Sequence, residues 1–292
     1  MSSQMTKAQM HLYGVNVEVA MDAPYDLSWP ISFQEETASA FSLPTAKTQP
    51  VRLGGFVGDT KLGGSVNCHT IEVTAHGNGT HTEGIGHILD THDSVLPQLN
   101  GTFILATVLT VPAGHFSDSE DSYAGQSHKT DRLVEASALQ RAYDSLPHTL
   151  PRPSKDSSEI GTMDALVVRG SQDDIETRGP RFSGQNPPYF SREAMETVVH
   201  WGVQHLLTNL PSVDREDCGG HTPNHRSYWG VSDDGGLEGQ SLRRQATITE
   251  MINPLFSTLE DGEYLLQIHA PPICSDAVLS RPFLFPFSPH SS

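Results

Sequence analysis

Short apolar runs rich in β-branched residues recur along the chain and are separated by turn-forming residues. Runs of this length and composition are typical of β-strands. Two other segments carry helical signals: residues 131–146 repeat aliphatic side chains at three-residue steps, and Ser191 can cap a helix over residues 191–204. The pattern predicts a mixed α/β, strand-rich protein. The predicted strands cover residues 12–20, 69–75, 102–111, 164–170, 205–210, 246–252 and 263–270.

Two long stretches interrupt this pattern. Residues 115–131 are polar and turn-rich, and residues 215–245 contain six glycines without a clear period. Strand signals resume after each stretch, so we expect loop insertions rather than domain linkers. A chain of 292 residues is long enough to bury a substantial core. We therefore expect a single domain over residues 1–292 with insertions near 115–131 and 215–245.

The negative charge of the chain argues against polyanions as binding partners. The formal net charge is −17 and the pI is near 5.2, so nucleic acids and anionic membrane surfaces would be repelled. The expected partner is a small-molecule substrate. Three widely spaced cysteines suggest no disulfide framework, and the start of the chain lacks the apolar core of a signal peptide. No apolar run approaches the roughly 20 residues that span a bilayer. We expect a soluble, cytoplasmic protein.

The stretch "HGNGTHTEGIGH" concentrates metal-binding chemistry in a glycine-rich segment. In an extended chain His81 and Glu83 share one face, and His87 stays nearby if the chain turns after them. Imidazole and carboxylate suit Zn²⁺ or Mn²⁺, which lower the pKa of bound water and polarise a carbonyl while a histidine moves protons. A histidine-rich surface loop is the alternative, and composition alone favours neither.

The segment "GTHTEGIGH" (79–87) resembles the G-T-H-x-D-x-P-x-H core of the cyclase family, metal-dependent hydrolases that include bacterial kynurenine formamidase and isatin hydrolase. By position, the resemblance implies that His81 and Glu83 bind metal and that His87 is the catalytic proton donor and acceptor. Glu83 replaces the usual Asp, and Ile85 stands where proline is usual. The family also implies a swivelling β/β/α domain that is usually a homo-oligomer.

The resemblance continues through "YDLSWPI", "DALVVRG" and the segment that ends in "PSVD". The family then has a histidine and, after an apolar stretch, a glutamate that both bind metal, which here implies His225 and Glu250. His221 is the alternative histidine. A carboxylate in the apolar run around Glu250 is costly unless it is paired or coordinated. Asp214 of "PSVD" suits a turn or the acceptor for a ligand histidine.

One position departs from the family pattern. The family's first metal ligand aligns to Gly77, and His76 lies one residue off. In a regular strand this slip would turn His76 away from the metal and leave one ion or a weaker second site. A bulge at the adjacent glycines could instead re-aim it. Asn78 could donate a carbonyl oxygen, although it more commonly closes a turn.

The resemblance implies a metal-dependent hydrolase with one or two Zn²⁺ or Mn²⁺ ions, acting on an amide or lactam C–N bond, as an arylformamidase does. A lactone hydrolase, a dehydratase or cyclase, and a non-catalytic binding protein with a degenerate site are the alternatives. Five aromatic residues could line a pocket for a ring-bearing substrate, although such residues are more often core: Trp29, Phe33, Phe41, Tyr228 and Trp229.

Overall fold

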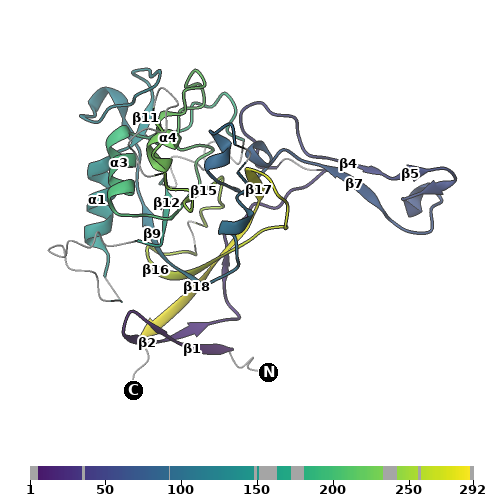
Figure 1. The fold of residues 1–292 in the computed structure, drawn as a ribbon, viewed down its shortest axis with the longest axis horizontal. Coiled ribbons are helices and arrows are strands. Elements are labelled where there is room, and N and C mark those ends of the chain that lie inside the picture. Colours follow the sequence, from purple (N-terminus) through teal and green to yellow (C-terminus); the bar gives the residue numbers. More distant parts are fainter. Residues whose placement is uncertain are drawn as a thin grey trace.

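The structure is a computed structural model that describes residues 6–34, 37–91, 93–147, 150, 163–171, 181–232, 242–255 and 258–289. Within these residues, eleven strands form one large sheet (Figure 1). In spatial order the strands are β1 (Lys7–Leu12), β2 (Val15–Ala20), β18 (Arg281–Pro289), β16 (Gly262–His269), β9 (Ile104–Thr110), β12 (Ala165–Arg169), β14 (His205–Thr208), β15 (Thr247–Glu250), β8 (His81–Glu83) and β17 (Ala277–Leu279), with β3 (Tyr25–Asp26) paired to β18.

The centre of the sheet is parallel and buried on both faces. Strands β9, β12, β14 and β15 run parallel, and the flanking strands β16 and β8 are antiparallel to them. Every residue of β12 is buried, with Leu166 and Val168 on one face and Ala165 and Val167 on the other. Such continuous apolar runs are what a strand covered on both faces requires.

Helices α1 (Ala136–Ser145), α3 (Arg192–His200) and α4 (Pro223–Trp229) share the core on one face of this parallel centre (Figure 1). Ser191 caps α3 by accepting a hydrogen bond from the Ala194 N–H. A second core, which includes Tyr264 and Leu266 of β16, covers the other face. A separate small sheet contains β10 (Gly114–His115), β11 (Arg132–Val134) and β13 (Tyr189–Phe190).

Strand β8 lies between β15 and β17 and positions the candidate site. His81 is directly opposite Glu250 on β15 and Leu279 on β17. Directly opposite residues project from the same face of a sheet, as do residues two apart on one strand, so His81, Glu83 and Glu250 face the same way. Between them, Thr82 turns to the opposite face, where its hydroxyl bonds those of Thr249 and Ser280.

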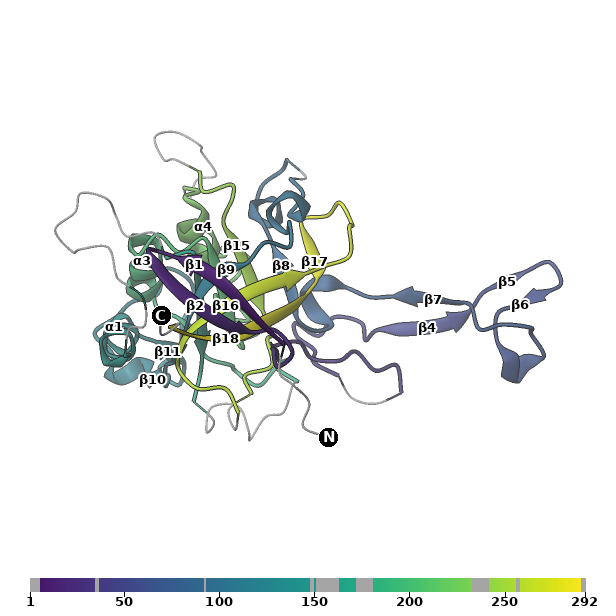
Figure 2. The same cartoon turned by 90° about the horizontal axis from the view of Figure 1, so that it is seen from below.

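A long arm projects from the body of the molecule (Figures 1 and 2). We use "the arm" for residues 47–73. Its two antiparallel ribbons are β4 (Lys47–Pro50) with β7 (His69–Glu72), and β5 (Arg52–Leu53) with β6 (Phe56–Val57) near the tip. A short 3₁₀ helix, Thr60–Leu62, completes the tip.

The predicted fold class is confirmed, and each predicted strand overlaps an observed one. Two local expectations are wrong. Residues 131–146 begin with strand β11 before α1. The irregular stretch 215–245 contains helix α4, whose seven residues, about two turns, are too few to show a period. Residues 233–241 of that stretch lie outside the described residues. Among the described residues, no helix is long and apolar enough to cross a membrane.

Candidate metal centre

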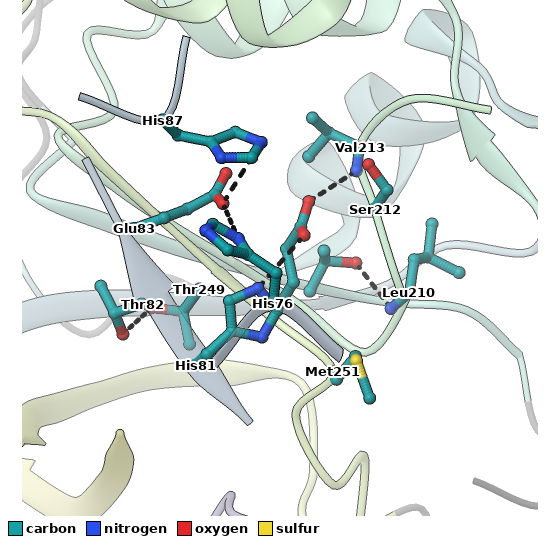
Figure 3. A network of polar contacts seen from close by, with 12 residues as sticks. His76, His81, Thr82, Glu83, His87, Leu210, Ser212, Val213, Thr249 and Met251 are labelled. Atoms are coloured by element: carbon teal, nitrogen blue, oxygen red, sulfur yellow. Dashed lines mark hydrogen bonds and ion pairs between the residues drawn. The ribbon is translucent and has the colours of Figure 1, made fainter. Parts of the chain in front are cut away.

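Glu83 lies at the centre of a buried cluster of histidines and carboxylates. Its side chain is 1% exposed, and Figure 3 shows His76 and His87 pointing toward it, with His81 beside them. The ring nitrogens Nδ1 of His76 and Nε2 of His225 each lie 3.0 Å from a Glu83 oxygen. The sequence-predicted residues His76, His81, Glu83, His87, His225 and Glu250 are therefore brought together.

His81 is fully buried and is held in a single orientation. Its Nδ1 lies 3.0 Å from the Gly79 carbonyl oxygen, which can only accept, so Nδ1 carries the proton. The Nε2 lone pair is then directed into the cluster, 3.6 Å from Glu250 Oε2. Gly79 has a φ of +138°, a conformation that favours glycine, and this bend brings its carbonyl back to the ring.

His225 is positioned by the start of helix α4. Asp214 accepts hydrogen bonds from the backbone N–H groups of Asn224 and His225 and from Nδ1 of the His225 ring, the last at 2.6 Å. Tyr123 donates to the other oxygen of Asp214 at 2.9 Å. A carboxylate behind a histidine fixes its tautomer and leaves Nε2 as the metal-binding atom. The suggested acceptor role of Asp214 agrees with these contacts.

His76 does not turn away from the cluster, so the expectation from a regular strand is wrong. Residues 75–77 form a 3₁₀ helix, in which side chains do not alternate between two faces. A side chain at position 77 would be crowded, because a Cβ there would lie 2.6 Å from Leu43 Cδ1 and 3.2 Å from the Ala40 carbonyl oxygen. Asn78 closes the turn instead: its Oδ1 accepts from the Thr74 N–H and its Nδ2 donates to the Pro44 carbonyl oxygen.

Glu250 and His87 lie at opposite edges of the cluster. Glu250 Oε1 accepts from the Val213 N–H at 2.9 Å and lies 3.7 Å from His225 Nε2. The His87 side chain is 28% exposed, and its Nε2 lies 3.9 Å from Glu83 Oε2. The cluster is thus sealed on the side of Glu250 and open to solvent on the side of His87.

Sequence analysis missed Asp276, which lies 200 residues from His76 in the chain. Its Oδ2 lies 2.9 Å from His76 Nε2 and 3.7 Å from His87 Nδ1. Asp276 immediately precedes β17, which pairs with β8, and only this pairing brings it to the site. A lone Asp before a short apolar run offers no distinctive sequence signal.

The charges in the cluster shift one another's protonation. Burial alone would raise the pKa of Glu83, yet the rings of His87, His225 and His76 hold it well below its usual range. Burial would lower the pKa of His225, but the carboxylates of Asp214 and Glu83 raise it well above its usual value. Burial also opposes protonation of His76, while Glu83 and Asp276 raise its pKa to about 9. The raised pKa values favour the protonated forms of His225 and His76, whose positive charge offsets the charge of the carboxylates.

The geometry fits a cation better than a network of hydrogen bonds. His81 Nε2 and both Glu83 oxygens are buried without a hydrogen-bond partner among the described residues, because the 3.0 Å contacts to Glu83 lack hydrogen-bond alignment. Two ligand atoms about 2.1 Å from one ion lie about 3.0 Å apart at a right angle and about 3.4 Å apart at the tetrahedral angle, a range that includes these contacts. Three overlapping groups could hold an ion: His76, His81 and Glu83; Glu83, His87 and His225; and His76, His87 and Asp276.

The aromatic residues proposed for a pocket do not line this site together. Tyr228 and Trp229 are fully buried in the core, with the Trp229 ring beside that of His225. Phe33 is exposed, and Trp29 lines a separate groove. The alternative ligand His221 is exposed and forms none of the contacts of the cluster that the structure shows.

Comparisons with known proteins bear on this geometry. The sequence model of the Cyclase family, described as "Putative cyclase", matches residues 25–215. Similar solved structures include a predicted metal-dependent hydrolase from Bacillus stearothermophilus, with 13% identity over 90% of this chain and 98% of that one, and a TM-score of 0.52. Isatin hydrolase A from Labrenzia aggregata has 12% identity over 90% and 93% of the chains, with a TM-score of 0.53. Isatin hydrolase A from Ralstonia solanacearum has 11% identity over 90% and 91%, also with 0.53. No curated protein matches the chain in sequence.

Proposed function

The chain belongs to the cyclase family, and we propose that it is a metal-dependent hydrolase that cleaves an amide or lactam C–N bond. One observation carries the proposal. Each of three histidines has one ring nitrogen held by an oxygen acceptor and the other turned toward Glu83 or Glu250: His76 by Asp276, His81 by the Gly79 carbonyl and His225 by Asp214. A hydrogen bond to one ring nitrogen fixes the tautomer and the orientation of a histidine, so that its other nitrogen can bind a metal ion.

The residues that would hold the metal are His76, His81, Glu83, His225 and Glu250. Nitrogen and carboxylate ligands suit Zn²⁺ or Mn²⁺, and five side chains can hold one ion or two. When bound, the ion supplies a water of lowered pKa and a positive charge that polarises the substrate carbonyl. Asp214 and Asp276 keep His225 and His76 in the ligand tautomer and orientation.

His87 moves the proton in the proposed reaction. Its side chain is the most exposed of the four histidines, at 28%, so it can meet a substrate that enters from the open side. Its imidazole accepts a proton from the attacking water and then returns that proton to the leaving nitrogen, so the C–N bond breaks without releasing an unstable amide anion. Asp276, 3.7 Å from His87 Nδ1, stabilises the ring while it is protonated.

The proposed substrate class is an aromatic amide or lactam, as for an arylformamidase. Its support is the similarity to solved isatin hydrolases together with the open side of the cluster. Isatin and an aryl formamide are therefore the first substrates to assay.

The test combines metal analysis with turnover. The purified protein should contain one or two Zn²⁺ or Mn²⁺ ions per chain and hydrolyse one of these substrates. His81→Ala should lose both metal and turnover. His87→Ala should retain the metal while kcat falls by about 100- to 10,000-fold, the usual contribution of a general acid–base. Metal loss in His87→Ala would show that His87 is a ligand, and an unaltered kcat would refute its catalytic role.

A further inference from the structure

His76 faces two different carboxylates through its two ring nitrogens. Its Nδ1 lies 3.0 Å from Glu83 Oε2 inside the cluster, and its Nε2 lies 2.9 Å from Asp276 Oδ2 on the outer side. The Glu83 side chain is 1% exposed, whereas that of Asp276 is 36% exposed. A metal ion held by Nδ1 therefore lies in the buried interior, and Nε2 remains at the border with solvent.

Three side chains bring ligand atoms together at this border. One ligand atom from each of His76, His87 and Asp276 lies within 4.8 Å of the other two. Asp276 Oδ2 is 2.9 Å from His76 Nε2 and 3.7 Å from His87 Nδ1, and the centroids of the two rings are 4.3 Å apart (Figure 3). The partly exposed ring of His87 can turn to shorten the longer distance. Two imidazole nitrogens and a carboxylate oxygen suit Zn²⁺, and solvent can supply the fourth ligand.

This outer group differs from the buried one in its ligands and in its charge. Asp276 is its single carboxylate and is not among the ligands that the family pattern implies, whereas the buried cluster contains both Glu83 and Glu250. When an ion already occupies Nδ1 of His76, an outer ion must also displace the Nε2 proton into solvent, so that the ring bridges both ions as an imidazolate. Lower negative charge and the loss of this proton both make the outer group the weaker binder.

An ion in the outer group would act directly on His87. A cation on Nδ1 lowers the basicity of the whole imidazole ring, because a second positive charge on the ring is repelled. The same ion occupies Asp276, the carboxylate that otherwise stabilises the protonated ring. His87 could then no longer accept a proton from the attacking water.

We propose that His76, His87 and Asp276 form an outer Zn²⁺ site, weaker than the buried one, whose occupation inhibits turnover. The site itself rests on the geometry of these three side chains. The inhibition rests on the proposed function, in which His87 moves the proton. Such a protein needs Zn²⁺ or Mn²⁺ in its buried cluster and loses activity when free Zn²⁺ rises further.

Isothermal titration of the purified, metal-loaded protein with chelator-buffered Zn²⁺ tests the outer site. The wild-type protein should bind a further Zn²⁺ ion more weakly than the ions that it retains through purification. Asp276→Asn and His87→Ala each remove one outer ligand. Each should weaken this ion at least about 100-fold, since even the loss of a residue that only orients a ligand costs about 10- to 100-fold.

Asp90→Asn is the matched control. Asp90 is an exposed carboxylate three residues after His87 and belongs to none of the groups that could hold an ion, so its replacement should leave the outer ion unchanged. The buried metal content shows whether the site of each variant is intact. In Asp276→Asn the new amide oxygen can still accept a hydrogen bond from His76 Nε2, so the buried metal should be retained.

Turnover measured against free Zn²⁺ tests the inhibition. The wild-type protein and Asp90→Asn should lose activity over the concentration range in which the outer ion binds, whereas Asp276→Asn should require at least about 100-fold more Zn²⁺. Outer binding that leaves turnover unchanged would overturn the inhibition.

Two results of the titration would overturn the outer site itself: a wild-type protein that binds no further Zn²⁺, and a weak ion that Asp276→Asn and His87→Ala leave unchanged. Failure of the proposed function gives a different result, the absence of buried metal or of turnover before any Zn²⁺ is added. The titration decides the outer site in either case, because it does not require turnover.

Discussion

Around Glu83 the protein buries charge, whereas along the arm it exposes apolar surface. The cluster places two carboxylates and two histidines, Glu83, Glu250, His81 and His225, in positions that are nearly inaccessible to water, and two of these groups have unpartnered polar atoms. The arm places leucine, isoleucine and valine side chains in water on a ribbon without a core. Each region reverses the distribution that stabilises a folded chain.

The difference between the two regions lies in what supports them. The cluster is held by the sheet, by α4 and by at least three hydrogen-bonded carboxylate or carbonyl acceptors, so its geometry exists before any ligand arrives. The arm is held only by its own ribbon and its root. Our proposed function gives the cluster its missing component, a cation, whereas no described part of the chain covers β7 of the arm. The predictions below separate the regions experimentally.

The largest expected contrast comes from the same truncation in the buried core of the body and on the arm. Ile268→Ala in the core of β16 should lower the free energy of unfolding by about 2–5 kcal/mol, because it leaves a cavity. Ile71→Ala on the arm should change it by less than about 0.5 kcal/mol in the monomer, since Ile71 is 60% exposed. Urea denaturation of both variants at low protein concentration measures the difference. A comparable loss from Ile71→Ala would mean that the arm packs against its own body.

A smaller effect is expected when the hydrogen bond that orients a single metal ligand, His225, is removed. Asp214→Asn removes the carboxylate that holds His225 Nδ1, and metal affinity should fall by about 10- to 100-fold. Tyr123→Phe removes only one hydrogen bond to Asp214 and should cost less than tenfold. Competition with a chelator measures both affinities. Equal losses in the two variants would show that metal affinity depends on the general packing of this region rather than on the orientation of His225.

The mildest perturbation is pH. The pKa of His76 is about 9 against an ordinary 6.5, although burial opposes it, because Glu83 and Asp276 stabilise the protonated ring. That stabilisation of the metal-free protein is complete below pH 6.5 and is lost as the pH rises through about 9. Metal binding needs neutral His76, so apparent affinity should rise about tenfold per pH unit up to about 9 from this proton. Isothermal titration with Zn²⁺ at several pH values checks this. A flat profile between pH 7 and 9 would contradict the assigned role.

Much of the fold could be predicted because apolar periodicity reports directly on burial. Strands such as β12 are buried on both faces, and their continuous apolar runs are visible in the sequence. Strands β4, β5 and β6 of the arm could not be predicted in this way, unlike β7. Residues 47–57 include Pro50 and two glycines and are largely exposed, so no core imposes a pattern on them. Strand β18 was missed because its prolines interrupt the apolar run, although it lies inside the large sheet.

The candidate site was predictable where its residues are close in sequence or match the family pattern. His81, Glu83 and His87 lie within one short segment, and the order of family motifs pointed to His225 and Glu250. The position of His76 depended on whether residues 75–77 continue a strand or form a 3₁₀ turn, and Gly77 permits both. Asp276 reaches the cluster only through the β8–β17 pairing, a long-range contact that no local pattern specifies.

The turn at Asn78 couples the position of His76 in the metal centre to the root of the arm. Its side chain bonds both the segment that leads into the arm, at Pro44, and the segment that leaves it, at Thr74, two residues before His76. Residues could be added or removed at the tip without rotating His76, because the ribbon absorbs the change in length. A single insertion between Thr74 and His76 would swing the imidazole out of the cluster. During evolution or in protein engineering, the reach of the arm can therefore vary freely while its anchorage cannot.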